Sequence, residues 1–227
     1  MYYRSRLFPF LSDIENQWQL IRDELDQYLA KQTEQAYTPY PITIPYSNEW
    51  KLLGIYQSQS NSSGIPNLDE QMARNLAFFP KTGALVKAIP GIIHAGFSKI
   101  TPGTHIRPHK ENYGNKLRCH LGIKVPDESD CAFMVAGKTK HWHEGDCLVF
   151  DGNSFHEAWN YTNTSRIVLL IDLDRDAAIE ASSQYGNVNQ QFIEPYSSRD
   201  RLNGYLMRIR SRYHRSKMRR ARKKNEL

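Results

Sequence analysis

Three side chains in the middle of the chain have the types and the spacing of a metal site. His109 and Glu111 stand two residues apart in an extended segment, so both leave the same face, and His156 follows 47 residues later in another β-rich stretch. Two imidazoles and one carboxylate form a facial triad, which leaves positions open on a non-haem Fe(II) ion for a co-substrate and O₂. The alternative is a pair of ordinary loop or core histidines, because the chain has eight histidines and H-x-E recurs by chance.

Two neighbouring strand patterns carry polar side chains that suit an enclosed anion. Residues 116–125 alternate, and Arg118 and His120 lie on the face opposite the apolar side chains. A strand that presents Arg and His together fits a carboxylate ligand. Arg166 opens the apolar run 167–173, where a guanidinium is costly to bury without a partner. The alternative for Arg166 is a strand-end arginine whose head group reaches water.

Turn signals divide the chain around these residues into short strands. We expect strands at 50–56, 92–101, 105–111, 116–125, 132–136, 140–142, 147–151 and 167–173, and another from His156. Short strands at nearly regular spacing indicate a sandwich or roll rather than a parallel sheet. Upstream, Ser12 and Glu15 have the spacing of a capping box, and apolar residues at helical intervals predict a helix from there to Tyr28. Further helices are expected over 67–79 and 82–87.

Length and composition agree with one domain and a short appendage. A chain of 227 residues with 40% hydrophobic content can bury a single sizeable core. We expect that domain at 1–204, with a helical flank over about 11–90, a β core over about 92–175, and a basic tail at 205–227. Three cysteines without a CxxC pair indicate reduced thiols. The sequence has no transmembrane run and no signal-peptide core, which predicts a cytoplasmic protein.

The end of the chain is strongly basic. Residues 208–224 contain ten Lys or Arg and no acid, while the whole chain has a net charge of +6. One interpretation is a solvated, partly helical or disordered end. The other is adhesion to an anionic surface, either phospholipid or nucleic acid. The apolar residues Met207, Ile209, Tyr213 and Met218 are too sparse to predict an insertion face, and the tail is not rich in aromatics that would stack on bases.

Three segments resemble one enzyme family. PGTHIRPHKENYGNKLRCHLGI, EGDCLVFDGNSFHEAWN and SRIVLL are similar to motifs of the aspartyl/asparaginyl β-hydroxylases, a family of Fe(II)/2-oxoglutarate oxygenases. The similarity is strong over about 95–173 and weaker back to about Leu11. It implies a mainly β fold, a double-stranded β-helix with flanking N-terminal helices. It also implies that oxidative decarboxylation of 2-oxoglutarate, with Fe(II) and O₂, is coupled to hydroxylation of an unactivated C–H bond.

The resemblance also assigns roles to individual residues. The histidines that match His109 and His156 bind iron in the family. The family residues that match Ser98, Arg118, His120 and Arg166 hold 2-oxoglutarate. Arg166 would pair with the distal carboxylate beside Ser98, whereas Arg118 and His120 would lie near the end that chelates the metal. Trp50 resembles an aromatic residue at the substrate mouth, although core packing explains it equally well.

Glu111 departs from the best-known members of the family. The peptide aspartyl hydroxylases have Gly at this position, and relatives that act on other substrates, including lipid A acyl chains, have Asp. Glu111 would therefore complete a carboxylate triad or sit beside an iron held by two histidines.

The sequence does not decide between several classes of substrate. It would be an Asp or Asn side chain of a peptide, an amino acid or related small molecule, or a lipid acyl chain at a membrane surface. A non-catalytic β-roll that binds acidic partners through its tail is the competing class.

Overall fold

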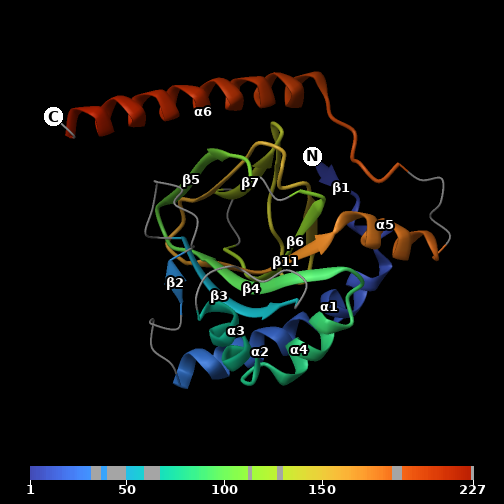
Figure 1. Cartoon of the computed structure of the whole chain (residues 1–227). Helices are drawn as coiled ribbons and strands as arrows, with labels where there is room; N and C mark the ends of the chain where they lie inside the picture. The colour runs from blue at the N-terminus through green and yellow to red at the C-terminus, as the bar shows by residue number, and fades with distance from the viewer. Residues whose placement is uncertain are drawn as a thin grey trace.

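Two antiparallel sheets form the centre of the computed structural model (Figure 1), which describes residues 1–31, 37–39, 50–58, 67–111, 114–126, 130–185 and 191–225. The larger sheet has the strand order β1-β9-β6-β11-β4-β3-β2, and the smaller sheet has the order β5-β10-β7-β8. The strands are β1 (Tyr2–Tyr3), β2 (Thr38–Pro39), β3 (Trp50–Gln57), β4 (Ile92–Ile100), β5 (Thr104–His109), β6 (Lys116–Lys124), β7 (Cys131–Val135), β8 (Lys138–Lys140), β9 (Cys147–Phe150), β10 (His156–Asn160) and β11 (Arg166–Asp174).

The chain passes back and forth between the two sheets. From β4 onward, the larger sheet receives β4, β6, β9 and β11, and the smaller sheet receives β5, β7 with β8, and β10. This alternation of antiparallel strands between two facing sheets is a double-stranded β-helix. The predicted fold class is therefore confirmed. The expected strands are found with small shifts at their ends, and the strand expected at 140–142 lies two residues earlier.

The alternation within the strands explains which face of the larger sheet meets which layer. Along β6, Leu117, Cys119, Leu121 and Ile123 belong to the apolar cluster that also contains residues of the N-terminal helices. His120 points the other way, and its ring contacts Phe133 of the smaller sheet at 5.3 Å between centroids. The polar residues expected on this face therefore lie in the space between the two sheets.

Helices cover the outer face of the larger sheet. They are α1 (Ser12–Asn16), α2 (Trp18–Lys31), α3 (Leu68–Leu76) and α4 (Pro80–Lys87), and α5 (Arg175–Ser183) follows β11 (Figure 1). The expected capping box is wrong, because Ser12 lies inside the helix and its hydroxyl donates to the Pro9 carbonyl at 2.6 Å. Glu15 instead accepts the Cys147 backbone N–H at 2.9 Å, which joins the helical layer to the sheet.

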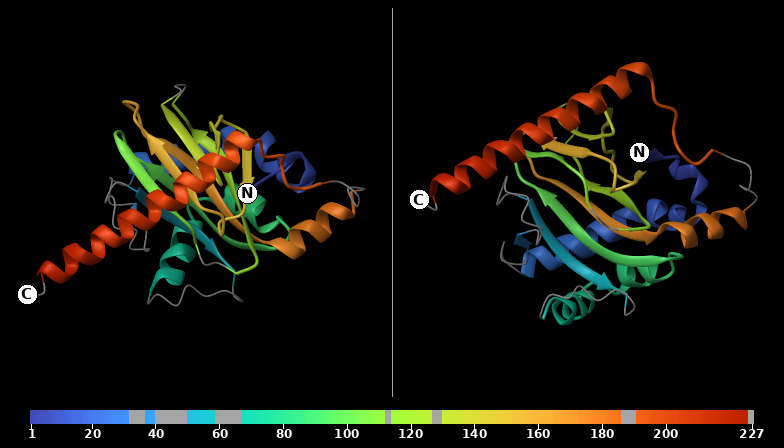
Figure 2. Two further views of the ribbon diagram at one scale, coloured as in Figure 1. Left: turned by 90° about the horizontal axis from the view of Figure 1, so that it is seen from above. Right: turned by 45° about the horizontal axis from the view of Figure 1, so that its top comes forward.

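The last helix, α6 (Ser198–Asn225), lies on the side of the smaller sheet (Figure 2). It begins seven residues before the expected tail, and its first turns are docked rather than solvated, with Met207 and Ser211 buried. Gly204 permits the approach, because a Cβ there would meet the Ala136 carbonyl oxygen at 2.6 Å. In the part of the chain that the structure describes, we find no helix with the length and apolarity to cross a membrane.

Candidate active site

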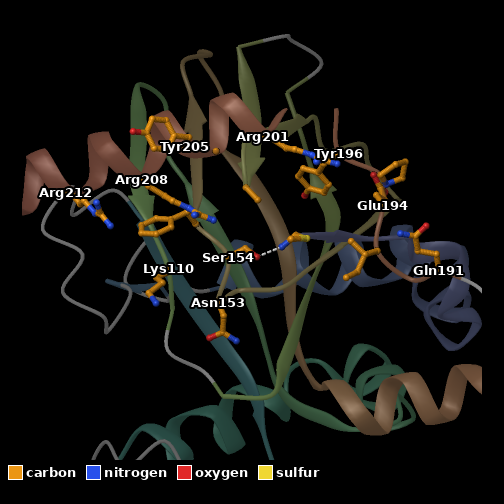
Figure 3. A pocket seen from close by; sticks show the side chains of 16 residues that line it. Lys110, Asn153, Ser154, Gln191, Glu194, Tyr196, Arg201, Tyr205, Arg208 and Arg212 are labelled. Atoms are coloured by element: carbon orange, nitrogen blue, oxygen red, sulfur yellow. Dashed lines mark hydrogen bonds between the residues drawn. The ribbon is translucent and has the colours of Figure 1, made fainter. Parts of the chain in front are cut away.

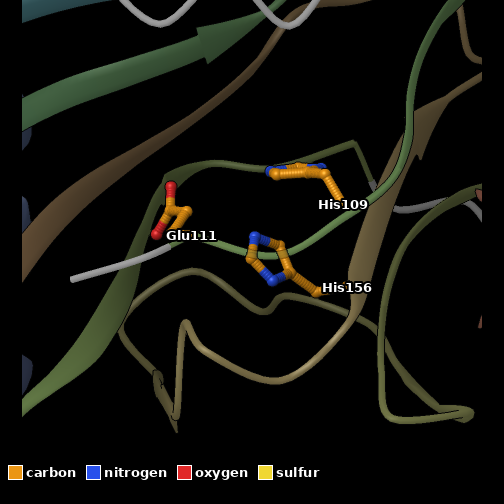
Figure 4. A group of neighbouring side chains, drawn as sticks. All are labelled: His109, Glu111 and His156. Carbon is orange, nitrogen blue, oxygen red and sulfur yellow. The ribbon is translucent and has the colours of Figure 1, made fainter. Parts of the chain in front are cut away.

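His109, Glu111 and His156 meet at one end of the smaller sheet (Figure 4). Antiparallel pairing of β5 with β10 places His109 opposite His156, with 4.2 Å between the ring centroids. Glu111 follows directly after β5, where its backbone N–H donates to the Gly152 carbonyl at 3.0 Å. One candidate ligand atom from each residue lies within 4.8 Å of the others. The structure thus brings together the three residues that the sequence predicted as a metal site.

Both imidazoles present the same nitrogen for coordination. His109 Nδ1 lies 2.8 Å from the Arg107 carbonyl oxygen, and His156 Nδ1 lies 2.8 Å from the Ser154 carbonyl oxygen. A carbonyl only accepts, so each Nδ1 carries the proton and each Nε2 has a free lone pair. His109 Nε2 is buried and has no hydrogen-bond partner among the described residues. Such an atom fits a metal ligand better than a core histidine.

Burial keeps both rings neutral near pH 7. Burial lowers the pKa of His109 to about 4, and the nearby positive charge of Arg118 acts in the same direction. The pKa of His156 falls well below its usual range, first because the ring is buried and then because His109 lies beside it. A neutral imidazole is the form that binds a metal, so neither ring must lose a proton when an ion enters at neutral pH.

A buried ion-pair network holds Glu111. Arg118 Nη1 donates to Glu111 Oε1 at 2.7 Å, and its Nε and Nη2 donate to the two oxygens of Asp172 at 2.6 and 2.9 Å. Burial alone would raise the pKa of Asp172, but the pairing with Arg118 holds it below its usual value. Arg118 therefore orients the candidate carboxylate ligand and is itself fixed by Asp172.

Asp172 is the residue that the sequence reasoning missed. Its signal is a carboxylate inside the apolar run of β11, at a position that pairs directly with Arg118 of β6. The contacts of Arg118 with two carboxylates differ from the cofactor contact that the resemblance implied. We assign it to positioning Glu111.

Arg166 is a buried cation of a different kind. Its side chain is almost fully enclosed, and Nη1 donates to the Ser98 carbonyl at 3.2 Å. The Trp142 ring lies 4.5 Å from the guanidinium carbon. Its Nε has no hydrogen-bond partner in the described part of the chain, and no carboxylate there lies within ion-pairing distance. Burial lowers the pKa of Arg166 to about 10, so the group remains charged at neutral pH.

The other predicted residues lie around this cation. Trp50 is buried, donates to the Ser98 hydroxyl at 3.0 Å, and has its ring centroid 6.2 Å from that of His109. His120 has two buried ring nitrogens, neither with a hydrogen-bond partner among the residues described. Burial lowers its pKa well below the usual range, and Arg166 is the next cause. A buried cation beside unsatisfied donors, close to the metal residues, fits a small dicarboxylate.

Comparison with known proteins gives a consistent family. Residues 15–176 match the family described as aspartyl/asparaginyl beta-hydroxylase. The ornithine lipid ester-linked acyl 2-hydroxylase of Rhizobium tropici is 36% identical over 179 residues, which cover 75% of this chain and 59% of that protein. The human aspartyl/asparaginyl beta-hydroxylase is 27% identical over 163 residues, which cover 72% of this chain and 21% of that protein.

Among solved structures, a prolyl-4-hydroxylase of Pseudomonas putida aligns with a TM-score of 0.41 and 14% identity, covering 69% of this chain and 87% of that one. The family match spans most of the chain and includes the residues of the site. The resemblance noted in the sequence is thereby confirmed, and this chain belongs to the aspartyl/asparaginyl β-hydroxylase family.

Proposed function

We propose that this protein is an Fe(II)- and 2-oxoglutarate-dependent hydroxylase. The observation that carries the proposal is the meeting of His109, Glu111 and His156 within 4.8 Å, in a fold that also encloses Arg166, a cation with no carboxylate partner among the described residues. Two neutral imidazoles and one carboxylate are the donor set that suits Fe(II) and leaves open positions. Bound iron supplies the activation of O₂ that converts a substrate C–H bond to C–OH while 2-oxoglutarate gives succinate and CO₂.

The protein's own groups bind, orient and exclude water. Arg166 binds the distal carboxylate of 2-oxoglutarate, which removes the cost of an unpaired buried guanidinium. Arg118 holds one oxygen of Glu111 in place and so orients the carboxylate beside the two histidines. The neutral His120 donates one N–H to a carboxylate without adding a second positive charge beside Arg166.

Aromatic side chains pack against this polar interior. Phe133 and Phe150 pack against the His156 ring at 5.8 and 5.6 Å between centroids. Their apolar surface keeps water from the histidines and strengthens every charge interaction inside the site.

Anaerobic titration of the metal-free protein tests the proposal. Adding Fe(II) in the presence of 2-oxoglutarate should produce the metal-to-ligand charge-transfer band, and admitting O₂ should yield succinate. His109→Ala should abolish both signals. His143→Ala changes an exposed histidine outside the site and serves as the matched control. A protein that gives neither the band nor 2-oxoglutarate-dependent succinate would instead be the non-catalytic β-roll.

Two substrate classes follow from the family. The first is an Asp or Asn side chain of a peptide, an amino acid, or a related small molecule. The second is a fatty acyl chain of a lipid, which the similarity to the Rhizobium protein supports. Glu111 also favours the second class, because the peptide hydroxylases have Gly there. Incubation with a peptide library and with a lipid extract, scored for products that gain one oxygen atom, separates the two.

A further inference from the structure

Helix α6 carries an exposed apolar stripe. Leu202, Tyr205, Leu206, Ile209 and Tyr213 are spaced by three, one, three and four residues, which places them on one side of a helix. Their exposed fractions range from 44% for Ile209 to 65% for Tyr213. More than half of the large hydrophobic side chains that are exposed in the described part of the protein belong to this stripe. A stripe of this length on one element is an interaction surface rather than scattered surface residues.

The stripe points away from the protein body. The side of α6 that packs on the small sheet carries Gly204, Met207 and Ser211, all buried. At about 100° per residue, these positions lie opposite Leu202, Leu206 and Ile209. The docked face fixes the helix to the β-helix and holds these three side chains outward, whereas Tyr205, at the edge of the stripe, also lines a cleft with Lys110 and Phe155.

The sequence alone does not predict this stripe. Its pattern offers Met207, Ile209, Tyr213 and Met218, which are too sparse for an insertion face. In the structure Met207 lies on the buried face of α6. Leu202, Tyr205 and Leu206 join the exposed stripe, because the helix begins at Ser198.

Arginines flank the stripe on both sides. Arg201, Arg208 and Arg212 lie along one edge and are exposed, and Arg199 and Arg210 lie along the other. Arg210 also donates to the buried carboxylate of Glu157 at 3.1 Å, which ties α6 to β10. The sequence of α6 continues beyond Tyr213 with seven more Lys or Arg. An apolar stripe between cationic edges is the pattern of a helix that lies in a membrane interface.

The cationic edge borders a cleft on the α6 side of the smaller sheet. Arg201, Arg208 and Arg212 line a cleft of about 1030 Å³ together with Lys110 (Figure 3). Lys110 directly follows His109, and Phe155 of the same cleft directly precedes His156. Neither His109 nor His156 lines this cleft, because neighbouring side chains of an extended strand leave opposite faces of the sheet.

Charge decides which partner covers the stripe. A second copy of the chain would bring two arginine-flanked stripes together, and like charges at close range oppose that contact. Nucleic acid would satisfy the arginines, but the aliphatic side chains of Leu202, Leu206 and Ile209 would gain nothing from it. The head-group region of an anionic bilayer accepts both components at once.

We infer that α6 docks this protein on anionic phospholipid membranes, with the stripe inserted among the head groups and the arginines on lipid phosphates. The docking stands on α6 alone. That the membrane also supplies the acyl substrate rests on the function proposed above.

Sedimentation of the full chain with vesicles tests the docking. We expect binding to phosphatidylcholine vesicles that contain phosphatidylglycerol, weak binding to phosphatidylcholine alone, and loss of binding at high salt. A triple variant, Leu202→Gln with Leu206→Gln and Ile209→Gln, should weaken binding on the order of 100-fold because three apolar side chains no longer enter the interface. A second triple variant, Arg201→Glu with Arg208→Glu and Arg212→Glu, should weaken it at least as much.

Matched controls keep the outcomes distinct. Phe78→Gln with Tyr185→Gln removes exposed aromatic groups outside α6 and should bind as wild type does. Fe(II) binding, and succinate formation without lipid, should be unchanged in the glutamine variant and in the control pair, so a failure of docking is separable from a failure of the proposed chemistry. The docking proposal is contradicted if the wild-type protein does not bind anionic vesicles, or if the glutamine variant binds them equally well. It is also overturned if wild type is a dimer that the glutamine variant dissociates, or if duplex DNA displaces the vesicles through the same stripe.

Discussion

Two arginines are buried in the space between the sheets, and they differ in the partners that surround their charge. Arg118, at the beginning of β6, directs three nitrogens at the carboxylates of Asp172 and Glu111. Arg166, at the beginning of β11, has one carbonyl contact and an aromatic neighbour, and its Nε has no hydrogen-bond partner within the described residues. Both side chains are less than 5% exposed. The cost of removing each charge from water is therefore similar, and among the described residues only Arg118 is offset by carboxylates.

The difference separates a positioning group from a binding group. A cation that already has two carboxylates has little affinity left for a ligand, and it fixes the residues around it. A cation without a counter-ion is stabilised only when an anion enters. The resemblance to the family grouped Arg118 and Arg166 as cofactor residues, whereas the contacts separate them. The same substitution at both positions should consequently have opposite effects on the stability of the metal-free protein.

Arg118→Met should produce the largest loss of stability. It keeps much of the side-chain volume but leaves Asp172 and Glu111 buried together without their cation, so we expect a loss of about 3–5 kcal/mol in the free energy of unfolding. Urea denaturation of the metal-free protein measures it. Asp172→Asn with Arg118→Met should recover part of the loss, because one of the two buried charges is then removed. Unchanged stability in the single variant would show that the network is not a structural support.

Arg166→Met should leave the metal-free protein as stable as wild type or more stable, because it removes an uncompensated charge. Binding of 2-oxoglutarate should weaken by about 2–5 kcal/mol, with Fe(II) binding nearly intact. Arg166→Lys should recover only part of this, since a point charge cannot reproduce the two-point contact of a guanidinium. Calorimetric titration of the iron-loaded protein provides the affinities. An unchanged requirement for 2-oxoglutarate in the methionine variant would remove Arg166 from the site.

Glu111 tests whether the carboxylate completes the metal site. Glu111→Ala should lower Fe(II) affinity by about 10- to 100-fold and remove most turnover, and Glu111→Asp should keep a measurable part of both. Anaerobic titration scored by the charge-transfer band gives the affinity. Because Arg118 also binds Glu111, the unfolding free energy is measured in parallel to exclude a general loss of structure. Full retention of iron binding in both Glu111→Ala and Glu111→Gly would leave His109 and His156 as the only protein ligands.

The metal residues were accessible to sequence reasoning because their signal is local. The spacing of His109 and Glu111 predicts that both side chains leave the same side of the chain, although β5 ends at His109, and the turn before His156 places it at the start of the next strand. The strands themselves follow from alternation and turn residues. The pairing of Arg118 with Asp172 was not accessible, since it depends on the register between β6 and β11. Register joins positions 54 residues apart and is set by the whole sheet.

The docking of α6 lay beyond the sequence for a similar reason. It requires the turn at Ala136 and Gly137 to approach the helix backbone at Gly204, a contact between segments far apart in the chain. The run of Lys and Arg residues begins at Arg208, so the charge pattern marks the end of the helix and not its beginning. The exposed stripe became recognisable only when the buried face was known.

The smallest predicted effect concerns His94, which extends the network of Arg118. Its Nδ1 lies 4.0 Å from Asp172 Oδ2, and burial is the main cause that lowers its pKa from 6.5 to about 4. The unfolded chain therefore binds more protons between these two values, so stability is full above pH 6.5 and declines as the pH falls toward 4. Each such group lowers the free energy of unfolding by roughly 1–2 kcal/mol by pH 5.

His94→Gln should lose less stability than wild type over this window, measured by urea denaturation of the metal-free protein at several pH values. The depressed pKa values of His109, His120 and His156 remain in both proteins, so the difference between the two curves reports His94 alone. Parallel curves would mean that His94 is protonated in the folded state and pairs with Asp172, and that Arg118 does not by itself satisfy that carboxylate.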